Sequence, residues 1–215
     1  MSTERAVLFD LDGTLTDPGE GIIKSLKVAL GSAAIPIPSN ERLSACIGPP
    51  LHDSLRELGA RPNQVADLIE IYRARYRDVG MFENAVYPGV PELLEHLASS
   101  GCRLFIATSK PTSIAEPILE HFKLRHFFEG VYGANLDGSL GDKVELLSHI
   151  HSETGLVTPE SAFVGDRRYD MSAAREHGMR AIGVLWGYGT RGELEASGAH
   201  HVVASPRSVA EALDA

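Results

Sequence analysis

The chain has 215 residues, 43% of them hydrophobic and 23% charged, and its net charge is −9 at pH 7. This composition suits a globular domain that carries one insertion, and the acidic balance argues against a nucleic-acid polymer as partner, which needs clustered basic residues. The two cysteines lack a metal-binding spacing, no apolar run approaches the roughly 18 residues of a membrane span, and residues 1–5 precede no signal region, so we expect a cytoplasmic protein without membrane contact.

The first predicted element is a buried strand over residues 6–11, which are apolar apart from Asp10. If the extended geometry continues, Asp10 and Asp12 share a face about 6–7 Å apart. Their charges would then repel by about 2.5 kcal/mol at an effective dielectric near ~20, a conflict that a divalent cation or a proton removes. Gly13 permits a sharp turn, and Thr14 places a hydroxyl beside it. An ordinary polar turn is the alternative for an isolated pair of this kind.

Residues 15–83 are predicted to form a small all-helical insertion. Apolar residues recur at helical spacing near 22–30, 41–47, 51–58 and 65–79, and proline-containing segments separate these stretches. The remaining residues, 1–14 and 84–215, then form one α/β core.

The core alternates strands with helices. We expect strands at 102–107, 130–133, 161–164, 181–186 and 201–203, and helices at 91–99, 114–122, 142–152, 173–177, 191–197 and 206–213. This alternation predicts a parallel sheet with helices on both faces.

Polar residues follow several of these strands, at the sheet edge where α/β proteins bind ligands. Asp10 and Asp12 follow the first strand, and Asp166 follows a later one. Thr108 and Ser109 follow the strand at 102–107, and Lys143 begins a helix on the same rim. Each feature alone has an ordinary explanation as a cap, a turn or a solvated charge, but their combination is much rarer.

The combination suits chemistry on a phosphoryl group, which needs donors for its oxygens, a cation and an in-line nucleophile. Donors and positive charge can come from Thr108, the Ser109 backbone amide and Lys143. Magnesium prefers oxygen ligands and would suit Asp10, Asp12 and Asp166. Asp170 lies one helical turn beyond Asp166 and can orient it or a metal-bound water, or can simply start a helix.

These residues resemble, in order, the four motifs of the haloacid dehalogenase-like (HAD) phosphatases. The matching segments are residues 10–15, Thr108 after its hydrophobic strand, Lys143, and Gly165-Asp166 with Asp170. The resemblance covers essentially the whole chain. It implies a Rossmann-like, doubly wound parallel sheet core with an inserted small α-helical cap domain.

The resemblance also implies residue roles. Asp10 would be the nucleophile that forms an aspartyl-phosphate, and Asp12 the general acid and then base. Thr108 and Lys143 would stabilise phosphate and nucleophile, and Ser109 and Gly13 would contact the phosphate. Mg²⁺ would be held by Asp10, Asp166 and the backbone carbonyl of Asp12, with Thr14, Lys110 and Asp170 in support.

Residues 132–138, 165–170 and 183–189 resemble the phosphoglycolate phosphatase-like group, and within it the bacterial 5′-nucleotidases. This likeness predicts a Mg²⁺-dependent phosphomonoester hydrolase acting on nucleoside 5′-monophosphates, with phosphoglycolate or another small phosphate ester as the alternative substrate. Residues 141–145 lack the Lys-Pro of many relatives, so Lys110 competes with Lys143 as the essential cation.

By analogy with family caps, substrate specificity would come from Ile22, Lys24 and the turn containing Gly48, Pro49, Leu51 and His52. An ordinary helix surface and a helix break explain these residues equally well. Other activities remain open at this point: a haloacid dehalogenase, which needs no magnesium, a phosphomutase, and a non-catalytic phospholigand-binding protein. Neither a monomer nor a homodimer is indicated.

Overall fold

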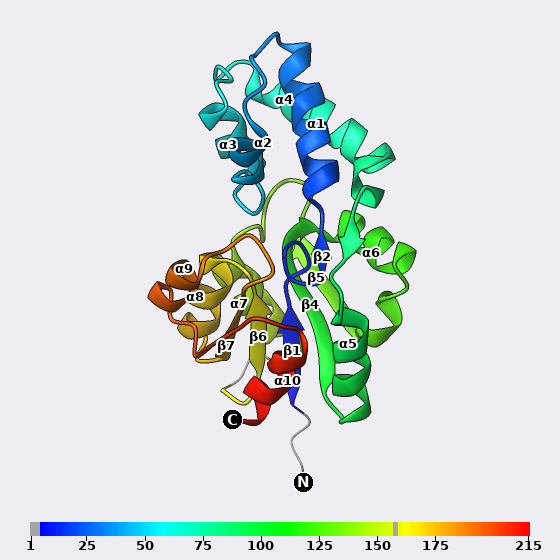
Figure 1. Cartoon of the computed structure of the whole chain (residues 1–215), viewed down its shortest axis with the longest axis vertical. Helices are drawn as coiled ribbons and strands as arrows, with labels where there is room; N and C mark the ends of the chain where they lie inside the picture. Colours follow the sequence, from blue (N-terminus) through cyan, green and yellow to red (C-terminus); the bar gives the residue numbers. More distant parts are fainter. Residues whose placement is uncertain (1–4, 157–158) are drawn as a thin grey trace. The chain divides into compact units, whose positions relative to one another are not determined.

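The computed structural model describes residues 5–156 and 159–215 and divides the chain into two compact units (Figure 1). The core unit is Met1–Thr16 with Val86–Ala215, and the helical unit is Asp17–Ala85. The sequence pattern predicted the boundaries of the helical insertion between residues 14 and 15 and between residues 83 and 84. Residues 1–4, part of the segment used to argue against export, lie outside the described residues.

A parallel sheet forms the middle of the core unit. Its strands are β1 (Ala6–Phe9), β4 (Arg103–Pro111), β5 (Gly130–Ala134), β6 (Ala162–Gly165), β7 (Arg180–Val184) and β8 (His201–Val203). Within the described residues these six strands lie in the order β5-β4-β1-β6-β7-β8, and every neighbouring pair is parallel. The predicted α/β parallel-sheet fold is therefore confirmed.

Helices cover both faces of this sheet. They are α5 (Val90–Ser99), α6 (Thr112–His121), α7 (Lys143–Thr154), α8 (Arg168–Glu176), α9 (Arg191–Ala196) and α10 (Arg207–Asp214), with a short 3₁₀ turn η2 (Arg125–Phe127). Helices α7 and α8 pack against one face, and α5 and α6 against the other (Figure 1). This two-sided cover explains why the central strands are apolar throughout rather than alternating.

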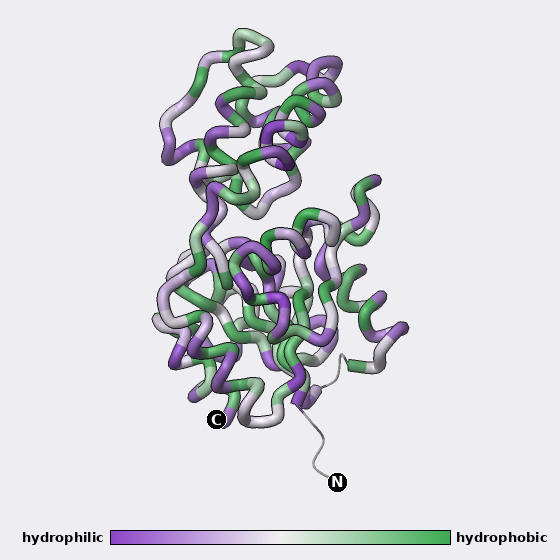
Figure 2. Tube along the Cα trace, turned by 90° about the vertical axis from the view of Figure 1, so that its right-hand side faces the viewer, coloured by the Kyte–Doolittle hydropathy of each residue, from purple (hydrophilic) through white to green (hydrophobic). Residues whose placement is uncertain are grey.

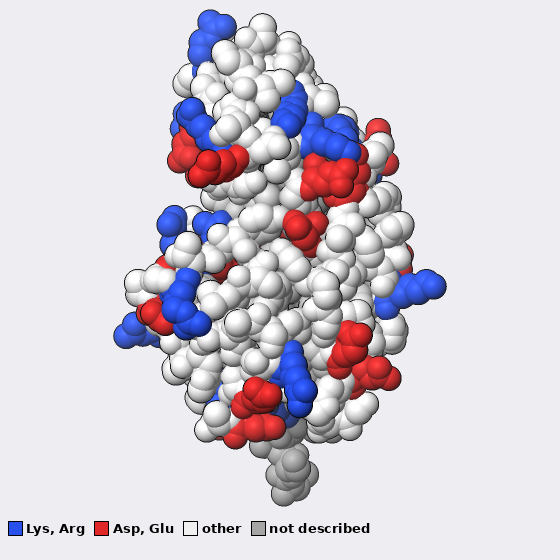
Figure 3. Space-filling view, in the orientation of Figure 1, with Lys and Arg blue, Asp and Glu red and all other residues white. Residues whose placement is uncertain are grey.

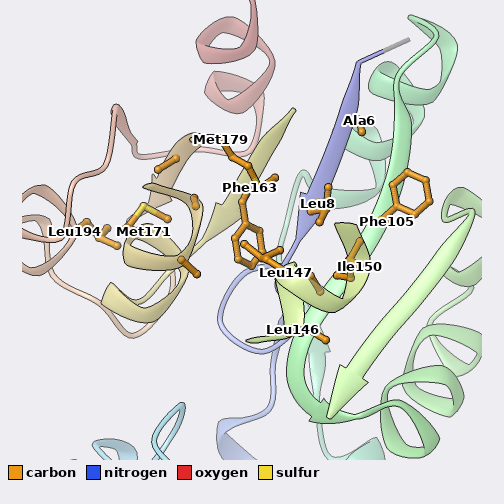
Figure 4. Packing of buried hydrophobic residues seen from close by; sticks show 14 residues of the cluster. Ala6, Leu8, Phe105, Leu146, Leu147, Ile150, Phe163, Met171, Met179 and Leu194 are labelled. Carbon is orange, nitrogen blue, oxygen red and sulfur yellow. The ribbon is translucent and has the colours of Figure 1, made fainter. Parts of the chain in front are cut away.

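The core between α7, α8 and the sheet consists of side chains that the sequence pattern placed inside. Leu8 of β1 and Phe163 of β6 are fully buried and pack with Leu147 and Ile150 of α7 and with Met171 of α8 (Figure 4). In Figure 2 the trace through the middle of the core unit is mainly hydrophobic. The apolar packing fixes the sheet whose edge carries the polar residues.

Strand β1 ends at Phe9, two residues earlier than predicted. The chain then turns tightly: the Leu11 carbonyl accepts bonds from the amides of Thr14, Leu15 and Thr16, and Gly13 has φ +82°. Strand β1 therefore does not extend to Asp12, which forms an isolated β-bridge with Thr16.

Strand β4 runs further than predicted, from Arg103 to Pro111 instead of ending at Ala107. It continues because β5 keeps pairing with it, first at Thr108 with Gly133 and, after an irregularity, at Pro111 with Ala134. The irregular end carries Thr108 to Lys110, so their side chains do not follow simple alternation.

The helical unit comprises α1 (Gly19–Ser32), α2 (Asn40–Ser44), α3 (Leu51–Glu57), α4 (Val65–Asp78) and a 3₁₀ turn η1 (Gly80–Phe82). Its buried side chains include Leu26, Leu43, Leu55 and Leu68. The chain passes between the units in two short strands that pair with each other, β2 (Thr16–Asp17) and β3 (Ala85–Val86).

Charged side chains on the face shown in Figure 3 lie in small groups of both signs, and no continuous basic surface is visible there. Ion pairs of the described residues include Arg103 with Glu129 at 2.6 Å. Within the described residues, every helix is too short or too polar to cross a bilayer.

Candidate active site

The end of β1 lies between β4 and β6, and this position brings Lys143 onto Asp10. The Lys143 ammonium lies 2.9 Å from Asp10 Oδ1 and 2.9 Å from Asp170 Oδ1, and it donates to the Ala107 carbonyl at 3.0 Å. Asp10 Oδ1 also accepts the Leu11 amide at 2.7 Å. Burial lowers the pKa of Lys143, but the charges of Asp10 and Asp170 together raise it above its ordinary value. The lysine therefore stays charged and fixes the Asp10 carboxylate.

Three buried carboxylates gather beside this lysine. One oxygen from each of Asp10, Asp166 and Asp170 lies within 4.8 Å of the others. Burial, then the charges of Asp170 and Asp10, raise the pKa of Asp166 well above its ordinary value. Burial raises the pKa of Asp170 to about 6, although Lys143 opposes the shift. One lysine does not offset three buried negative charges.

Asp170 serves two purposes at once. Its Oδ2 accepts the Arg167 amide at 3.0 Å at the start of α8, which is the helix-start role considered from the sequence. Its Oδ1 forms an ion pair with Lys143 at 2.9 Å and lies beside the Asp10 and Asp166 carboxylates. That oxygen thus remains a possible metal ligand.

Asp12 pairs with a different cation from Asp10. Its Oδ2 lies 2.7 Å from the Lys110 ammonium, while its buried Oδ1 has no hydrogen-bond partner among the described residues. Burial raises the pKa of Asp12, Lys110 opposes the shift, and Asp10 adds to it. The two lysines that the sequence set in competition therefore hold different carboxylates.

The remaining rim residues differ in exposure. Thr108 is buried, and its Oγ1 accepts the Lys110 amide at 3.3 Å, whereas Ser109 is exposed. Thr14 is buried and its hydroxyl donates to Asp166 Oδ1 at 3.4 Å. A Cβ at Gly13 would lie 2.3 Å from Asp166 Oδ2, so only glycine fits there.

The predicted specificity residues lie in the helical unit. Ile22 is buried there, and Lys24 pairs with Glu83 at 2.9 Å. Gly48 has φ +101°, Pro49 follows it, and Leu51 begins α3. His52 is exposed and lies 3.0 Å from Asp53. Substrate contact by these residues stays a prediction.

Sequence reasoning missed the loop after β7. The Tyr188 amide donates to Asp166 Oδ2 at 2.7 Å, and the Trp186 indole donates to the Thr14 carbonyl at 2.9 Å. Residues 183–189 had been noticed only for their likeness to relatives. Their position after a strand of the same sheet was the signal that could have assigned them to the site.

The donor set is consistent with magnesium. The three clustered carboxylates offer only oxygen atoms, and their like charges crowd in a buried space. Hard oxygen ligands of this kind suit Mg²⁺, whose charge would relieve the repulsion. Asp170, rather than the Asp12 carboxylate, completes the group.

Fold and site together define an α/β protein with a buried, carboxylate-rich site at the carboxyl end of its parallel sheet. The family model described as haloacid dehalogenase-like hydrolase matches residues 7–184, and the chain belongs to that family. A 5′-nucleotidase of Pseudomonas aeruginosa is 39% identical over 209 residues, 97% of this chain and 95% of that one. A phosphoglycolate phosphatase of Salmonella typhimurium is 28% identical over 207 residues, 86% of this chain and 82% of that one.

Solved structures agree with this placement. A predicted phosphatase from Clostridium acetobutylicum has a TM-score of 0.92 and 37% identity, and each chain is covered completely. Protein tyrosine kinase A (PtkA) of Mycobacterium tuberculosis has a TM-score of 0.85 and 35% identity, again with complete coverage. The class predicted from the sequence, a HAD-like phosphoric monoester hydrolase of the phosphoglycolate phosphatase-like group, is confirmed.

Proposed function

We propose that the chain is a Mg²⁺-dependent phosphomonoesterase that acts through an aspartyl-phosphate on Asp10. One observation carries the proposal: the Asp10 carboxylate is fixed by Lys143 within a three-carboxylate group, while the Asp12 carboxylate keeps one oxygen free of hydrogen bonds. The first arrangement suits a nucleophile, and the second suits an acid that must reach a leaving group.

In the first step an oxygen of Asp10 attacks phosphorus and the bond from phosphorus to the ester oxygen breaks. Asp12 gives its proton to the departing alkoxide through Oδ1, while Lys110 holds Oδ2. The raised pKa of Asp12, caused chiefly by burial, favours the protonated form that this step needs.

In the second step Asp12 takes a proton from the attacking water, the acyl-phosphate bond breaks, and inorganic phosphate leaves Asp10 free again. The Thr108 hydroxyl, the Ser109 amide and Lys143 donate to phosphoryl oxygens. Because Thr108 Oγ1 accepts the Lys110 amide, its hydrogen remains available for such a bond. Bound by Asp10, Asp166 and Asp170, together with the Asp12 backbone carbonyl, Mg²⁺ would supply charge neutralisation at those oxygens.

Nucleoside 5′-monophosphates are the proposed substrates, since the P. aeruginosa relative carries the name 5′-nucleotidase over nearly the same length. Phosphoglycolate is the alternative, from the S. typhimurium relative. The helical unit would select among such esters, and the protein would work in the cytoplasm without a macromolecular partner.

The test measures phosphate release from nucleoside monophosphates, phosphoglycolate and sugar phosphates, with Mg²⁺ and with EDTA. We expect release that requires Mg²⁺ and is fastest with a nucleoside monophosphate, and no release by Asp10→Asn. Activity that survives EDTA would reject the metal. Transfer from ATP to a tyrosine peptide without phosphomonoester hydrolysis would reject the hydrolase, an outcome that likeness to PtkA makes worth including.

A further inference from the structure

The loop after β7 approaches two loops of the candidate site that are distant from it in sequence. Strands β6 and β7 pair so that Gly165 lies beside Gly183, and both chains leave the sheet at the same edge. From there the Trp186 indole reaches the Thr14 carbonyl, and the Tyr188 amide reaches Asp166. One short segment thus contacts both the Asp10 loop and the Asp166 loop.

These contacts hold the Asp166 carboxylate from two loops that also contact each other. Its Oδ1 accepts from the Thr14 hydroxyl at 3.4 Å and its Oδ2 from the Tyr188 amide at 2.7 Å. Thr14 is in turn held by Trp186, two residues before Tyr188. Since both oxygens of Asp166 are held from different loops, its orientation depends on how those loops lie against each other.

Two glycines allow the loop to come this close. A Cβ at Gly187 would lie 2.2 Å from the Gly13 carbonyl oxygen and 2.5 Å from Asp166 Cβ. A Cβ at Gly189 would lie 1.9 Å from the Asp166 carbonyl oxygen. The obstructing atoms are mainly backbone and cannot rotate away, so space rather than backbone conformation requires glycine here.

We propose that Trp186 is a positioning residue: its indole N–H holds the Asp10 loop against the loop after β7, whose Tyr188 amide binds Asp166, and it thereby sets the geometry of the three-carboxylate group. The inference rests on the proposed magnesium site but not on turnover. Trp186 is the chain's one tryptophan, so its fluorescence reports directly on this contact.

The test is calorimetric titration of the full chain with Mg²⁺ after removal of metal by EDTA. Trp186→Phe removes the indole donor while keeping an aromatic ring, and we expect Mg²⁺ binding about 3- to 10-fold weaker, the range for one lost hydrogen bond. Gly187→Ala should weaken binding more, because its methyl group meets Asp166 and Gly13. Gly192→Ala is the matched control: no atom lies within 4 Å of its added Cβ, and it should bind Mg²⁺ as the wild type does.

A merely structural role gives a different pattern. Trp186→Phe would then lower the metal-free unfolding temperature and leave Mg²⁺ affinity within twofold of wild type, which would overturn the proposal. If Gly187→Ala fails to fold, the Mg²⁺ affinity of Trp186→Phe still tests the proposal.

In the wild type, Trp186 emission should change on Mg²⁺ addition with the same midpoint as calorimetry. Emission unaffected by saturating Mg²⁺ would also contradict the proposal. If no phosphate ester is hydrolysed, the proposed function fails while these binding measurements still stand.

Discussion

Replacing Lys143 by methionine removes the cation from three buried carboxylates while keeping most of the side-chain length. The lysine side chain is 5% exposed, contacts Asp10 and Asp170 at 2.9 Å each, and lies over the Phe163 ring at 5.2 Å. Removing one member of a buried ion pair costs about 3–5 kcal/mol. We therefore expect the free energy of unfolding to fall by that amount at pH 7.5 without Mg²⁺, and turnover to fall by about 100-fold or more.

The cost of Lys143→Met should depend on pH. The pKa of Asp170 is about 6, so at pH 5 much of this carboxyl is already neutral and needs the lysine less. Unfolding by urea, followed by Trp186 fluorescence in the core unit, measures the difference at both pH values. The control is Lys24→Met, whose side chain is 46% exposed and whose ion pairs are screened by solvent, so its loss should change the free energy of unfolding little. A loss of stability at Lys143 no larger than at Lys24, or one independent of pH, would contradict the role of Lys143 as counter-ion of the buried carboxylates.

Three further predictions test other parts of the site. Lys110→Met should slow hydrolysis of alkyl phosphates about 10-fold but slow aryl phosphates less, since a good leaving group needs little help from Asp12; equal losses would contradict this. Without metal, the free energy of unfolding should fall by about 2–3 kcal/mol as pH rises from about 4 through about 6. The reason is that Asp170 binds its proton more tightly in the folded chain than in the unfolded chain. Urea titrations at a series of pH values measure that slope, and added Mg²⁺ should flatten it. A free energy of unfolding that rises with pH over this range would contradict the prediction. Exchanging residues 48–52 should reorder substrate KM values and leave acyl-phosphate hydrolysis unchanged, as steady-state and single-turnover assays would show; equal changes in both would count against a role in specificity.

The sequence predicted those features that local pattern determines. The apolar run before Asp10 predicts a buried strand, and Leu8 and Phe9 are indeed fully buried. Gly13 was expected at a sharp turn and has a positive φ. The order of strands and helices was sufficient to place Asp10 and Asp166 directly after strands of one sheet and Thr108 near the carboxyl end of another.

Side-chain pairing was less predictable because it depends on backbone departures from regular geometry. The irregular end of β4 carries Lys110 to Asp12, and β1 ends at Phe9, before either carboxylate. Neither irregularity leaves a signal in spacing alone. The contact of Trp186 with Thr14 spans 172 positions and requires the pairing of β6 with β7, which only the folded chain displays.

The proposed mechanism depends on one claim, that Asp10 carries the phosphoryl group. Rapid acid quenching during turnover of a nucleoside monophosphate, followed by peptide mass spectrometry, tests it directly. We predict a phosphorylated peptide with the modification on Asp10, which borohydride reduction converts to homoserine at that position alone. A phosphoryl group on another residue, or wild-type phosphate release by Asp10→Asn, would contradict the claim.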